Sequence, residues 1–172
     1  RSFGQMQRRL LTDHLTGLSN REAAVRRIEE RMLRPRRRGD DSRFAVLFVD
    51  LNDFKRVNDR FGHDAGDRAL REVAARLRAA VRADDLVARF AGDEFVVLLN
   101  RVENRRDAES VRAQVEQTLA EPLQTLQAID SQAAGRHRGG ACGLALFPDD
   151  ASDLESLLKI ADEDMYRRKP VA

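Results

Sequence analysis

Apolar residues recur along the chain in two patterns: a helical spacing of three to four residues, and short continuous runs of strand length. The helical spacing predicts helices that each carry an apolar stripe on one face. The stripes run over Val25–Met32, Leu70–Val81, Val111–Leu119 and Leu154–Met165. A shorter mixed segment, from Phe3 to about Thr12, is expected to be the end of a helix that arrives from upstream.

Capping residues indicate where two of these helices begin. Ser19 and Glu22 have the serine-x-x-glutamate form of a capping box, which predicts a helix from there to about Leu33. Asp64 is expected to cap the second helix, which should end near Arg82.

The continuous apolar runs predict the strands. Phe44–Leu51, with the sequence FAVLFVDL, has the length and the valine and phenylalanine content of a central strand covered on both faces. Leu86–Phe90 and Phe95–Leu99 are predicted to form a hairpin, Ala141–Phe147 a further strand and Leu123–Ile129 a weak one. Hairpin and crossover connections together predict an α+β domain with a largely antiparallel sheet.

The composition is that of a globular protein. With 172 residues, 42% of them hydrophobic and 35% charged, the chain is long enough to bury the core of one domain. No apolar run approaches the ~20 residues of a membrane span, and the N-terminal residues lack a signal-peptide pattern. We therefore expect a cytoplasmic domain without a membrane segment. Because the sequence begins at Arg1, we expect it to be a fragment of a longer chain.

Charge and cysteine content argue against two kinds of site. The 31 basic and 29 acidic residues nearly balance, so no global field demands nucleic acid as a partner. The basic run Arg34–Arg38 and the glycine-rich segment Gly135–Gly140 are interpreted as loops. Cys142, the only cysteine, excludes an intramolecular disulfide and a multi-cysteine zinc site.

Carboxylates stand at two places where strands of the predicted sheet end. Asp50 lies at the end of the first strand, and Asp93 and Glu94 follow Gly92 at the hairpin tip, where glycine allows a tight backbone. If the first strand and the hairpin are neighbours, these acids converge and repel one another unless a cation neutralises them. Oxygen ligands favour Mg²⁺ or Mn²⁺, and Mg²⁺ also binds substrate phosphates. Taken singly, each acid is better explained as a polar turn residue; taken together, they indicate a nucleotide-processing site.

The segment that links the first strand to the second helix, Asp50–Leu70, superficially has the alternating acids of a calcium loop. Phe54, Lys55 and Arg56 stand where such a loop needs oxygen ligands and a glycine, which excludes an EF-hand. A short connection after a central strand instead offers backbone N–H groups at a helix N-terminus, where phosphate oxygens bind. Lys55 and Arg56 would add positive charge there.

Three polar residues in the same segment are candidates for contacts to a base. The Asn58 amide can donate and accept, and the Asp67 carboxylate can accept from the N1–H and exocyclic amine of guanine but not from the edge of adenine. Asp67 is also explained as an acid near a helix N-terminus, and the two roles are compatible. His63 is either a hydrogen-bonding loop residue or a substrate contact, and the sequence leaves both open.

Four motifs carry a resemblance that covers nearly the whole chain. They are DHLTGLSNR (13–21), DLNDFKRVNDRFGHDAGD (50–67), RFAGDEF (89–95) and ADEDMY (161–166). In this order they resemble the signatures of the GGDEF family of bacterial diguanylate cyclases. The resemblance implies a GGDEF domain over 13–172, preceded over 1–12 by the end of an upstream linker or signalling helix. It also implies a palm-like, ferredoxin-like fold with a five-stranded, largely antiparallel sheet surrounded by helices.

The implied activity is the condensation of two GTP molecules into cyclic di-GMP with release of two pyrophosphates, with Mg²⁺ or Mn²⁺ as cofactor. Each domain holds one GTP, so the resemblance implies a homodimer under the control of an upstream sensory or dimerising segment. By motif position, Asp50, Asp93 and the Leu51 carbonyl would bind the metals. Glu94 would assist metal binding or help to deprotonate the attacking 3′-hydroxyl.

Motif position also implies contacts to nucleotides. Asn58, Asp67 and His63 would contact guanine, and Phe54 and Lys55 would contact the triphosphate. Gly92 would lie beside the nucleotide, and Lys169 would bind a phosphate. Arg82 and Asp85 have the arginine-x-x-aspartate form of the family's product-binding inhibitory site, where cyclic di-GMP would bind. An ordinary helix C-terminus, where arginine is favourable, explains the same two residues.

The chain departs from the family pattern at several positions. Alanine replaces the first glycine of the GGDEF turn at Ala91, and Asp164 and Arg168 stand where the last motif usually has alanines. Alanine costs little if φ is negative there, and we expect a working turn. The main hypothesis is an active diguanylate cyclase domain. The alternative is a catalytically silent module that binds GTP or cyclic di-GMP and signals to a partner; a nucleic-acid binder using Arg34–Arg38 is the least favoured.

Overall fold

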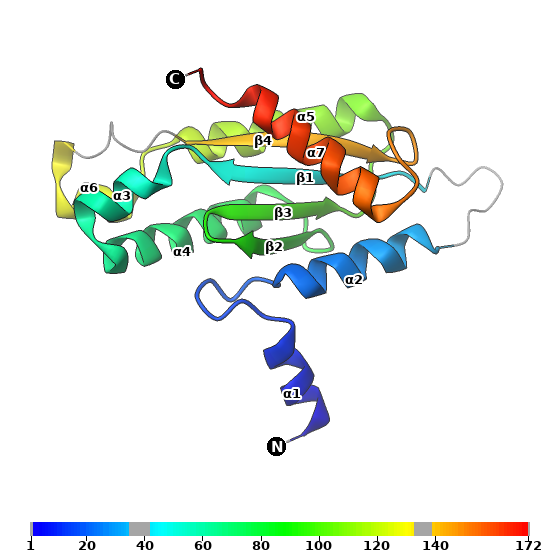
Figure 1. Ribbon diagram of the computed structural model, residues 1–172, viewed down its shortest axis with the longest axis horizontal. Helices are drawn as coiled ribbons and strands as arrows, with labels where there is room; N and C mark the ends of the chain where they lie inside the picture. Colours follow the sequence, from blue (N-terminus) through cyan, green and yellow to red (C-terminus); the bar gives the residue numbers. More distant parts are fainter. Residues whose placement is uncertain (1, 35–41, 133–138, 172) are drawn as a thin grey trace.

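The computed structural model of the protein describes residues 2–34, 42–132 and 139–171 (Figure 1). Its helices are α1 (Phe3–Leu10), α2 (Arg21–Met32), α3 (Phe54–Phe61), α4 (His63–Ala80), α5 (Arg105–Ala120), α6 (Gln124–Ile129) and α7 (Leu154–Arg168). Its strands are β1 (Phe44–Leu51), β2 (Leu86–Ala91), β3 (Glu94–Leu99) and β4 (Gly140–Phe147). Most of the two predicted loops, 35–38 and 135–138, lies outside the described residues.

The strands form one sheet in the order β2-β3-β1-β4. β1 pairs antiparallel with β3 on one side and with β4 on the other, and β2 pairs antiparallel with β3. Helices α3 and α4 connect β1 to β2, so the β2–β3 hairpin returns to lie beside β1 (Figure 1). The predicted α+β class and antiparallel sheet are confirmed. Of the five strands predicted, four are found in the described ranges.

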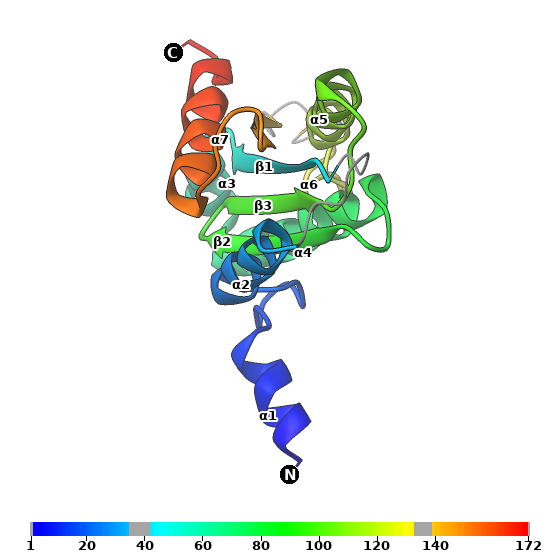
Figure 2. The same ribbon diagram turned by 90° about the vertical axis from the view of Figure 1, so that its right-hand side faces the viewer.

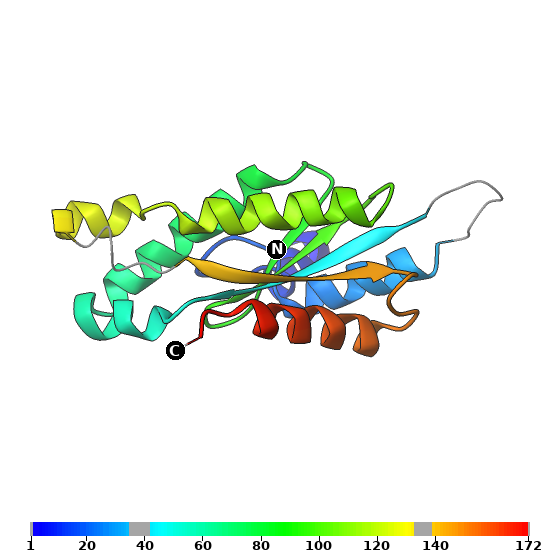
Figure 3. The same ribbon diagram turned by 90° about the horizontal axis from the view of Figure 1, so that it is seen from above.

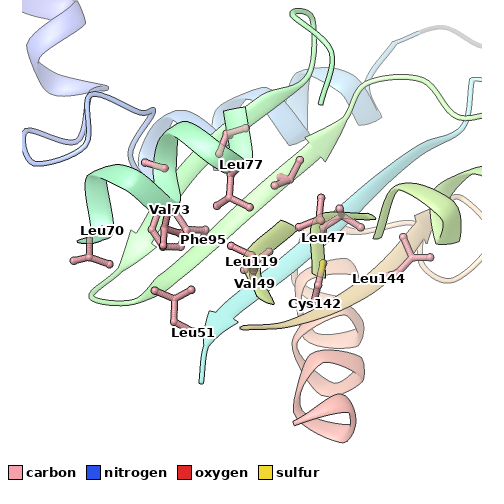
Figure 4. Close-up of a cluster of buried hydrophobic side chains, with 14 of the residues drawn as sticks. Leu47, Val49, Leu51, Leu70, Val73, Leu77, Phe95, Leu119, Cys142 and Leu144 are labelled. Atoms are coloured by element: carbon pink, nitrogen blue, oxygen red, sulfur yellow. The ribbon is translucent and has the colours of Figure 1, made fainter. Parts of the chain in front are cut away.

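The sheet separates two hydrophobic cores, because successive side chains of a strand point to opposite faces. Leu47 and Leu51 of β1 pack in one core with residues of α4 and α5, such as Leu77 (Figure 4). Phe44 and Phe48 pack in the other core with residues of α2 and α7. Figures 2 and 3 show these helices on either side of the sheet. The prediction that β1 is a central strand covered on both faces is therefore confirmed.

Helix α7 approaches β4 closely at Gly143. A Cβ atom at this position would lie 2.1 Å from the carbonyl oxygen of Ala161 and 2.1 Å from the backbone nitrogen of Met165. Only a residue without a side chain fits such an approach. The contact fixes α7 along β4, and the residue after α7, Lys169, consequently reaches the end of β1.

The prediction of a weak strand at Leu123–Ile129 is wrong, because this segment contains α6. The start of α6 is held by Glu72 of α4, whose carboxylate accepts hydrogen bonds from the backbone N–H groups of Gln124 and Thr125 at 2.9 and 2.8 Å. These are donors that the start of a helix leaves unsatisfied. A contact with a residue far away in the sequence thus decides the conformation of an apolar segment.

Two predicted helix starts and one predicted loop are also corrected. Helix α2 is capped by Asn20, not by Ser19: the Asn20 side chain accepts from the Ala23 N–H at 3.0 Å. Helix α4 begins at His63 after Gly62, whose φ of 86° turns the chain, so Asp64 lies within the first turn and is not the cap. The connection between β1 and α4, interpreted as a loop, contains α3.

Candidate active site

One end of the sheet gathers acidic residues from two elements. Asp50, near the end of β1, pairs in register with Glu94, the first residue of β3. The Leu51 N–H donates to the carbonyl oxygen of Asp93 at 3.1 Å, which ties the hairpin turn to the end of β1. The antiparallel pairing of β1 with β3 therefore places Asp50, Asp93 and Glu94 at one end of the sheet. Figure 1 shows the end of β1 beside the turn of the β2–β3 hairpin.

The surroundings of Asp93 and Glu94 disfavour the ionisation of these two carboxylates. Burial raises the pKa of Asp93 above its usual 3.8, and repulsion from the Asp50 carboxylate raises it further. Burial also raises the pKa of Glu94, with repulsion from Asp50, Asp93 and Asp162 as further causes. Negative charge at both positions is therefore unfavourable until a cation approaches.

A lysine supplies one positive charge at this cluster. The Lys169 ammonium lies 3.1 Å from Asp50 Oδ2, and it donates to the carbonyl oxygens of Asp50 and Leu51 at 3.4 and 3.3 Å and to Asn52 Oδ1 at 3.2 Å. Carboxylate, carbonyl and amide oxygens around one cation are also the donors that Mg²⁺ and Mn²⁺ prefer, so these residues fit a divalent metal. Within the described ranges, no three His, Cys, Asp or Glu side chains form a metal site by themselves. Backbone, water and phosphate oxygens would have to complete the coordination of such an ion.

The hairpin turn is held from outside by an ion pair that the sequence analysis did not single out. Arg89 donates from Nε to the carbonyl oxygen of Gly92 at 2.9 Å and lies 3.3 Å from an Asp13 carboxylate oxygen. Burial tends to raise the pKa of Asp13, but hydrogen bonds from Thr16 and the charge of Arg89 outweigh it and lower the pKa. The only signal for this contact was that Asp13 and Arg89 belong to two of the recognised motifs.

The turn itself is unstrained at Ala91. Asp53 is the one non-glycine residue with a positive φ in the described ranges, so Ala91 has a negative φ and its methyl group costs little. Gly92 also lacks a positive φ, and a Cβ atom added to it would meet no heavy atom within 4 Å. The space beside Gly92 is therefore open on the protein's side.

The start of α3 lies directly after β1. Asp53, with a φ of 54°, turns the chain into the helix. The side chain of Phe54 is buried and that of Lys55 is exposed. Among the described residues, the backbone N–H groups of Phe54 and Lys55 donate to no acceptor, as is usual for the first residues of a helix. These two N–H groups are available to an anion.

Asn58 and Asp67 lie on the two helices that meet at Gly62. Both side chains are half-buried, and in the part of the chain that the structure describes neither forms a hydrogen bond or an ion pair. His63, the first residue of α4, is exposed at the same corner. The structure thus brings the three candidate base contacts to one helical corner.

A family comparison identifies the chain. The family model for "Diguanylate cyclase, GGDEF domain" matches residues 10–171. The chain belongs to the GGDEF family. Members of this family that are diguanylate cyclases generally use divalent metal ions.

Curated relatives and a solved structure resemble this GGDEF domain. MucR of Pseudomonas aeruginosa, a bifunctional diguanylate cyclase/cyclic di-GMP phosphodiesterase, is 41% identical over 162 residues, covering 92% of this chain and 22% of MucR. The diguanylate cyclase TpbB of the same organism is 37% identical over 159 residues, covering 91% of this chain and 34% of TpbB. The solved structure of the TpbB GGDEF domain matches with a TM-score of 0.76 and 34% identity, covering 91% of this chain and 87% of that one. This chain spans much less than half of either curated relative.

The arginine-x-x-aspartate residues of this GGDEF domain lie away from the acidic cluster. Arg82 and Asp85 precede β2, whereas the acidic turn follows it, so a strand that rises about 3.3 Å per residue separates them. Both residues line a cavity of about 640 Å³ together with residues of β3 and α5. The Asp85 carboxylate is buried and accepts from the backbone N–H groups of Arg82 and Asn100, each at 2.9 Å. No ion pair of the Arg82 side chain is found in the described ranges.

The helices carry no membrane-spanning segment in the described residues: none is both long enough and apolar enough to cross a bilayer.

Proposed function

We propose that this GGDEF domain is an active diguanylate cyclase, which condenses two GTP molecules into cyclic di-GMP and releases two pyrophosphates. The observation that carries the proposal is the meeting of Asp50, the Leu51 carbonyl, Asp93 and Glu94 at one end of the sheet. A cation, the Lys169 ammonium, already lies among the oxygens of this cluster. In-line attack at a phosphate needs positioning and charge neutralisation more than a protein nucleophile.

Each residue of the acidic cluster has a task in this proposal. Asp50, Asp93 and the Leu51 carbonyl would hold Mg²⁺ or Mn²⁺, which, when bound, would neutralise phosphate charge and stabilise the leaving pyrophosphate. Burial and the neighbouring carboxylates raise the pKa of Glu94. Glu94 accepts the proton of the 3′-hydroxyl while the hydroxyl oxygen attacks the α-phosphorus of the facing GTP. The bond from that phosphorus to the pyrophosphate breaks in the same step. Lys169 moves from Asp50 to the phosphates as nucleotide binds.

The α3–α4 corner positions the nucleotide. The free N–H groups of Phe54 and Lys55 bind phosphate oxygens, and the ammonium of Lys55 adds positive charge. The Asn58 amide and the Asp67 carboxylate read the guanine edge, with His63 beside them. The open space next to Gly92 leaves room for the nucleotide backbone.

The reaction requires two copies of the chain, because each holds one GTP and the two must face each other. Helix α1 supports this part of the proposal. Phe3, Met6 and Leu10 are 77%, 65% and 65% exposed and recur at intervals of three and four residues, as on a helix that packs against a second helix. We propose that upstream sensory or dimerising segments act on activity through this helix.

Cyclic di-GMP is proposed to bind back at the cavity beside Arg82 and to inhibit the enzyme. The guanidinium of Arg82 is free to donate two parallel hydrogen bonds to a guanine edge or a phosphate. Arg82→Ala is expected to leave the initial rate unchanged and to remove inhibition by added cyclic di-GMP, measured as product formed over time. Inhibition that persists unchanged in this variant contradicts the assignment of the cavity.

The activity is tested by incubating the protein with GTP and Mg²⁺ and separating the nucleotides by chromatography. The wild type is expected to form cyclic di-GMP, and Asp93→Asn to lower the rate by about 100-fold or more through loss of a metal-ligand charge. Glu30→Gln, the same chemical change at an exposed position of α2, is the matched control and should keep full activity. Binding of GTP without product in the wild type would instead assign a catalytically silent binding module.

A further inference from the structure

Gly66 lies in α4, where nothing about the backbone requires glycine. Its N–H donates to the carbonyl oxygen of Gly62 at 3.0 Å, an ordinary helical hydrogen bond, and its φ is not positive. Glycine is among the poorest helix formers, because it loses the most backbone freedom on folding. The reason for glycine at this position must therefore be space.

The space beside Gly66 is filled by Asn58 from the neighbouring helix α3. A Cβ atom at position 66 would lie 1.8 Å from Asn58 Oδ1 and 2.9 Å from Asn58 Cγ, far inside van der Waals contact. No backbone atom outside the helix is among the three nearest atoms. An alanine at this position would thus displace the end of one flexible side chain and leave the packing of the helices unchanged.

The Asn58 amide is the group that the proposed function needs beside Asp67. Asp67 follows Gly66 directly, and the Gly62 N–H donates to the Asn58 carbonyl oxygen at 2.9 Å, which closes the corner between the helices. Neither the Asn58 amide nor the Asp67 carboxylate has a hydrogen-bond partner in the described ranges. Both groups are therefore free for a base, and the absence of a side chain at position 66 leaves the Asn58 amide the space that it occupies next to the residue before Asp67.

We infer that Gly66 is a positioning residue for base recognition: it leaves the Asn58 amide in place near Asp67, so that the amide and the guanine-selective carboxylate contact one base together. The inference rests on the proposed function, because guanine recognition by Asn58 belongs to that proposal. It predicts opposite effects of one substitution. Gly66→Ala should keep the stability of the fold or increase it, because alanine favours the helix. The same substitution should weaken guanine binding.

The probe is a GTP analogue with a methylene group between the α and β phosphorus atoms, which cannot release pyrophosphate, and its adenine counterpart. Both are titrated calorimetrically into the protein with Mg²⁺. The wild type should bind the guanine analogue more tightly. Gly66→Ala should weaken that binding by about tenfold or more, the effect of losing a hydrogen bond in a partly buried site, and leave the adenine analogue unaffected. Its thermal midpoint should stay within about 4 °C of the wild type or rise.

Asn58→Ala and the double variant with Gly66→Ala isolate the mechanism. Asn58→Ala should weaken guanine binding as much as Gly66→Ala does, and the double variant no further, because no amide remains to be displaced. Gly4→Ala is the matched control: Gly4 also lies in a helix, but a Cβ atom there meets nothing within 4 Å, so binding should not change.

Each outcome decides a separate statement. A wild type that binds the two analogues equally overturns the proposed guanine recognition and, with it, the role of Gly66. If the wild type prefers the guanine analogue and Gly66→Ala binds that analogue as tightly as the wild type does, the inference about Gly66 is overturned and the proposed guanine recognition stands. Additive losses in the double variant, or a marked fall in the thermal midpoint of Gly66→Ala, overturn it as well, because the added methyl group then acts on the helix packing and not on Asn58.

Discussion

In the proposed function, a metal ion would bind at the acidic cluster where the Lys169 ammonium now lies. Its ammonium is within 3.4 Å of oxygens from Asp50, Leu51 and Asn52, and the Lys169 and Asp50 side chains are only 24% and 22% exposed. A divalent ion bound to Asp50 and the Leu51 carbonyl must displace this ammonium, because two cations repel each other at such distances. The nucleotide-free protein is therefore expected to bind metal weakly.

Lys169→Met removes the charge and keeps most of the side-chain length. We expect it to tighten Mn²⁺ binding to the nucleotide-free protein by about tenfold, the typical value of a hydrogen bond to a charged group, and to lower turnover of GTP. Calorimetric titration with Mn²⁺ measures the first effect. Lys159→Met, on the exposed side of α7, is the control and should bind Mn²⁺ like the wild type. Equal Mn²⁺ affinity in Lys169→Met and the wild type would contradict this competition.

Asp93 is expected to destabilise the metal-free fold at neutral pH. Its folded-state pKa is raised above 3.8, mainly by burial and then by the Asp50 charge, so the folded protein holds a proton that the unfolded chain has already released. The free energy of unfolding therefore falls as the pH rises from 3.8 through the raised pKa, and the loss is complete above it.

Asp93→Asn removes this penalty, and we expect its thermal midpoint in EDTA at neutral pH to exceed that of the wild type. The difference should shrink as the pH falls below the ordinary aspartate range. Thermal denaturation followed by circular dichroism across pH measures it, with Glu30→Gln as control. A variant that is less stable than the wild type at neutral pH would show that hydrogen bonds of the carboxylate outweigh its burial.

At the scale of elements, side chains cover the edge of β4 that pairs with no strand in the described ranges. Its Cys142 N–H donates to a Glu116 carboxylate oxygen at 3.2 Å and its Leu144 N–H to an Asp164 carboxylate oxygen at 2.9 Å. Exposed edge groups of this kind invite pairing with another strand. Asp164, which stands where the family motif usually has alanine, thus has a structural role that the sequence did not reveal.

Asp164→Ala leaves the Leu144 N–H without its acceptor and releases Arg168, whose Nε donates to Asp164 at 3.1 Å. We expect a loss of about 1–3 kcal/mol, the usual effect of an unsatisfied buried donor, measured by urea unfolding. Glu163→Ala, which removes an exposed ion pair with Lys159 on the same helix, should cost less than about 1 kcal/mol. Equal losses in the two variants would indicate that the Leu144 N–H finds another acceptor.

Elements set by local pattern were predictable from the sequence, and elements set by distant contacts were not. β1 was recognisable because a strand buried on both faces is continuously apolar. Leu123–Ile129 was misassigned because Glu72, about fifty residues earlier, supplies the capping that makes it helical. The spacing of Phe54, Val57 and Phe61 did carry a signal for α3, but the helix is only 8 residues long.

The candidate site was likewise predictable from the sequence only in part. The meeting of Asp50 with Asp93 and Glu94 followed from chain order, once the hairpin was assumed to lie beside β1. The contacts of Lys169 with Asp50 and of Asn58 with Gly66 depend on how helices dock on the sheet and on each other. Residue spacing carries no information on those distances.

At the scale of the whole molecule, α1 stands away from the body (Figures 1 and 2). None of its residues is buried, and its apolar side chains form one stripe. It remains tied to the domain: the Asn20 N–H donates to the Leu11 carbonyl oxygen at 3.0 Å and the Asn20 amide to that of Leu10 at 2.8 Å. A second copy packed along this stripe would therefore transmit its orientation to the domain that α1 carries.

Met6→Glu with Leu10→Glu tests whether α1 joins two copies. Burying both side chains in a helix pair contributes about 3 kcal/mol, so the double variant should weaken dimerisation by about 100-fold or more, measured by sedimentation equilibrium. Specific activity should then rise steeply with protein concentration. Gln5→Glu introduces a charge of the same sign off the stripe and should dimerise like the wild type. Because α1 lies outside the α3–α4 corner, Met6→Glu with Leu10→Glu should bind the non-reacting GTP analogue as tightly as the wild type. Weakened binding would mean that α1 acts on the nucleotide site within one chain and not by joining two copies of the chain.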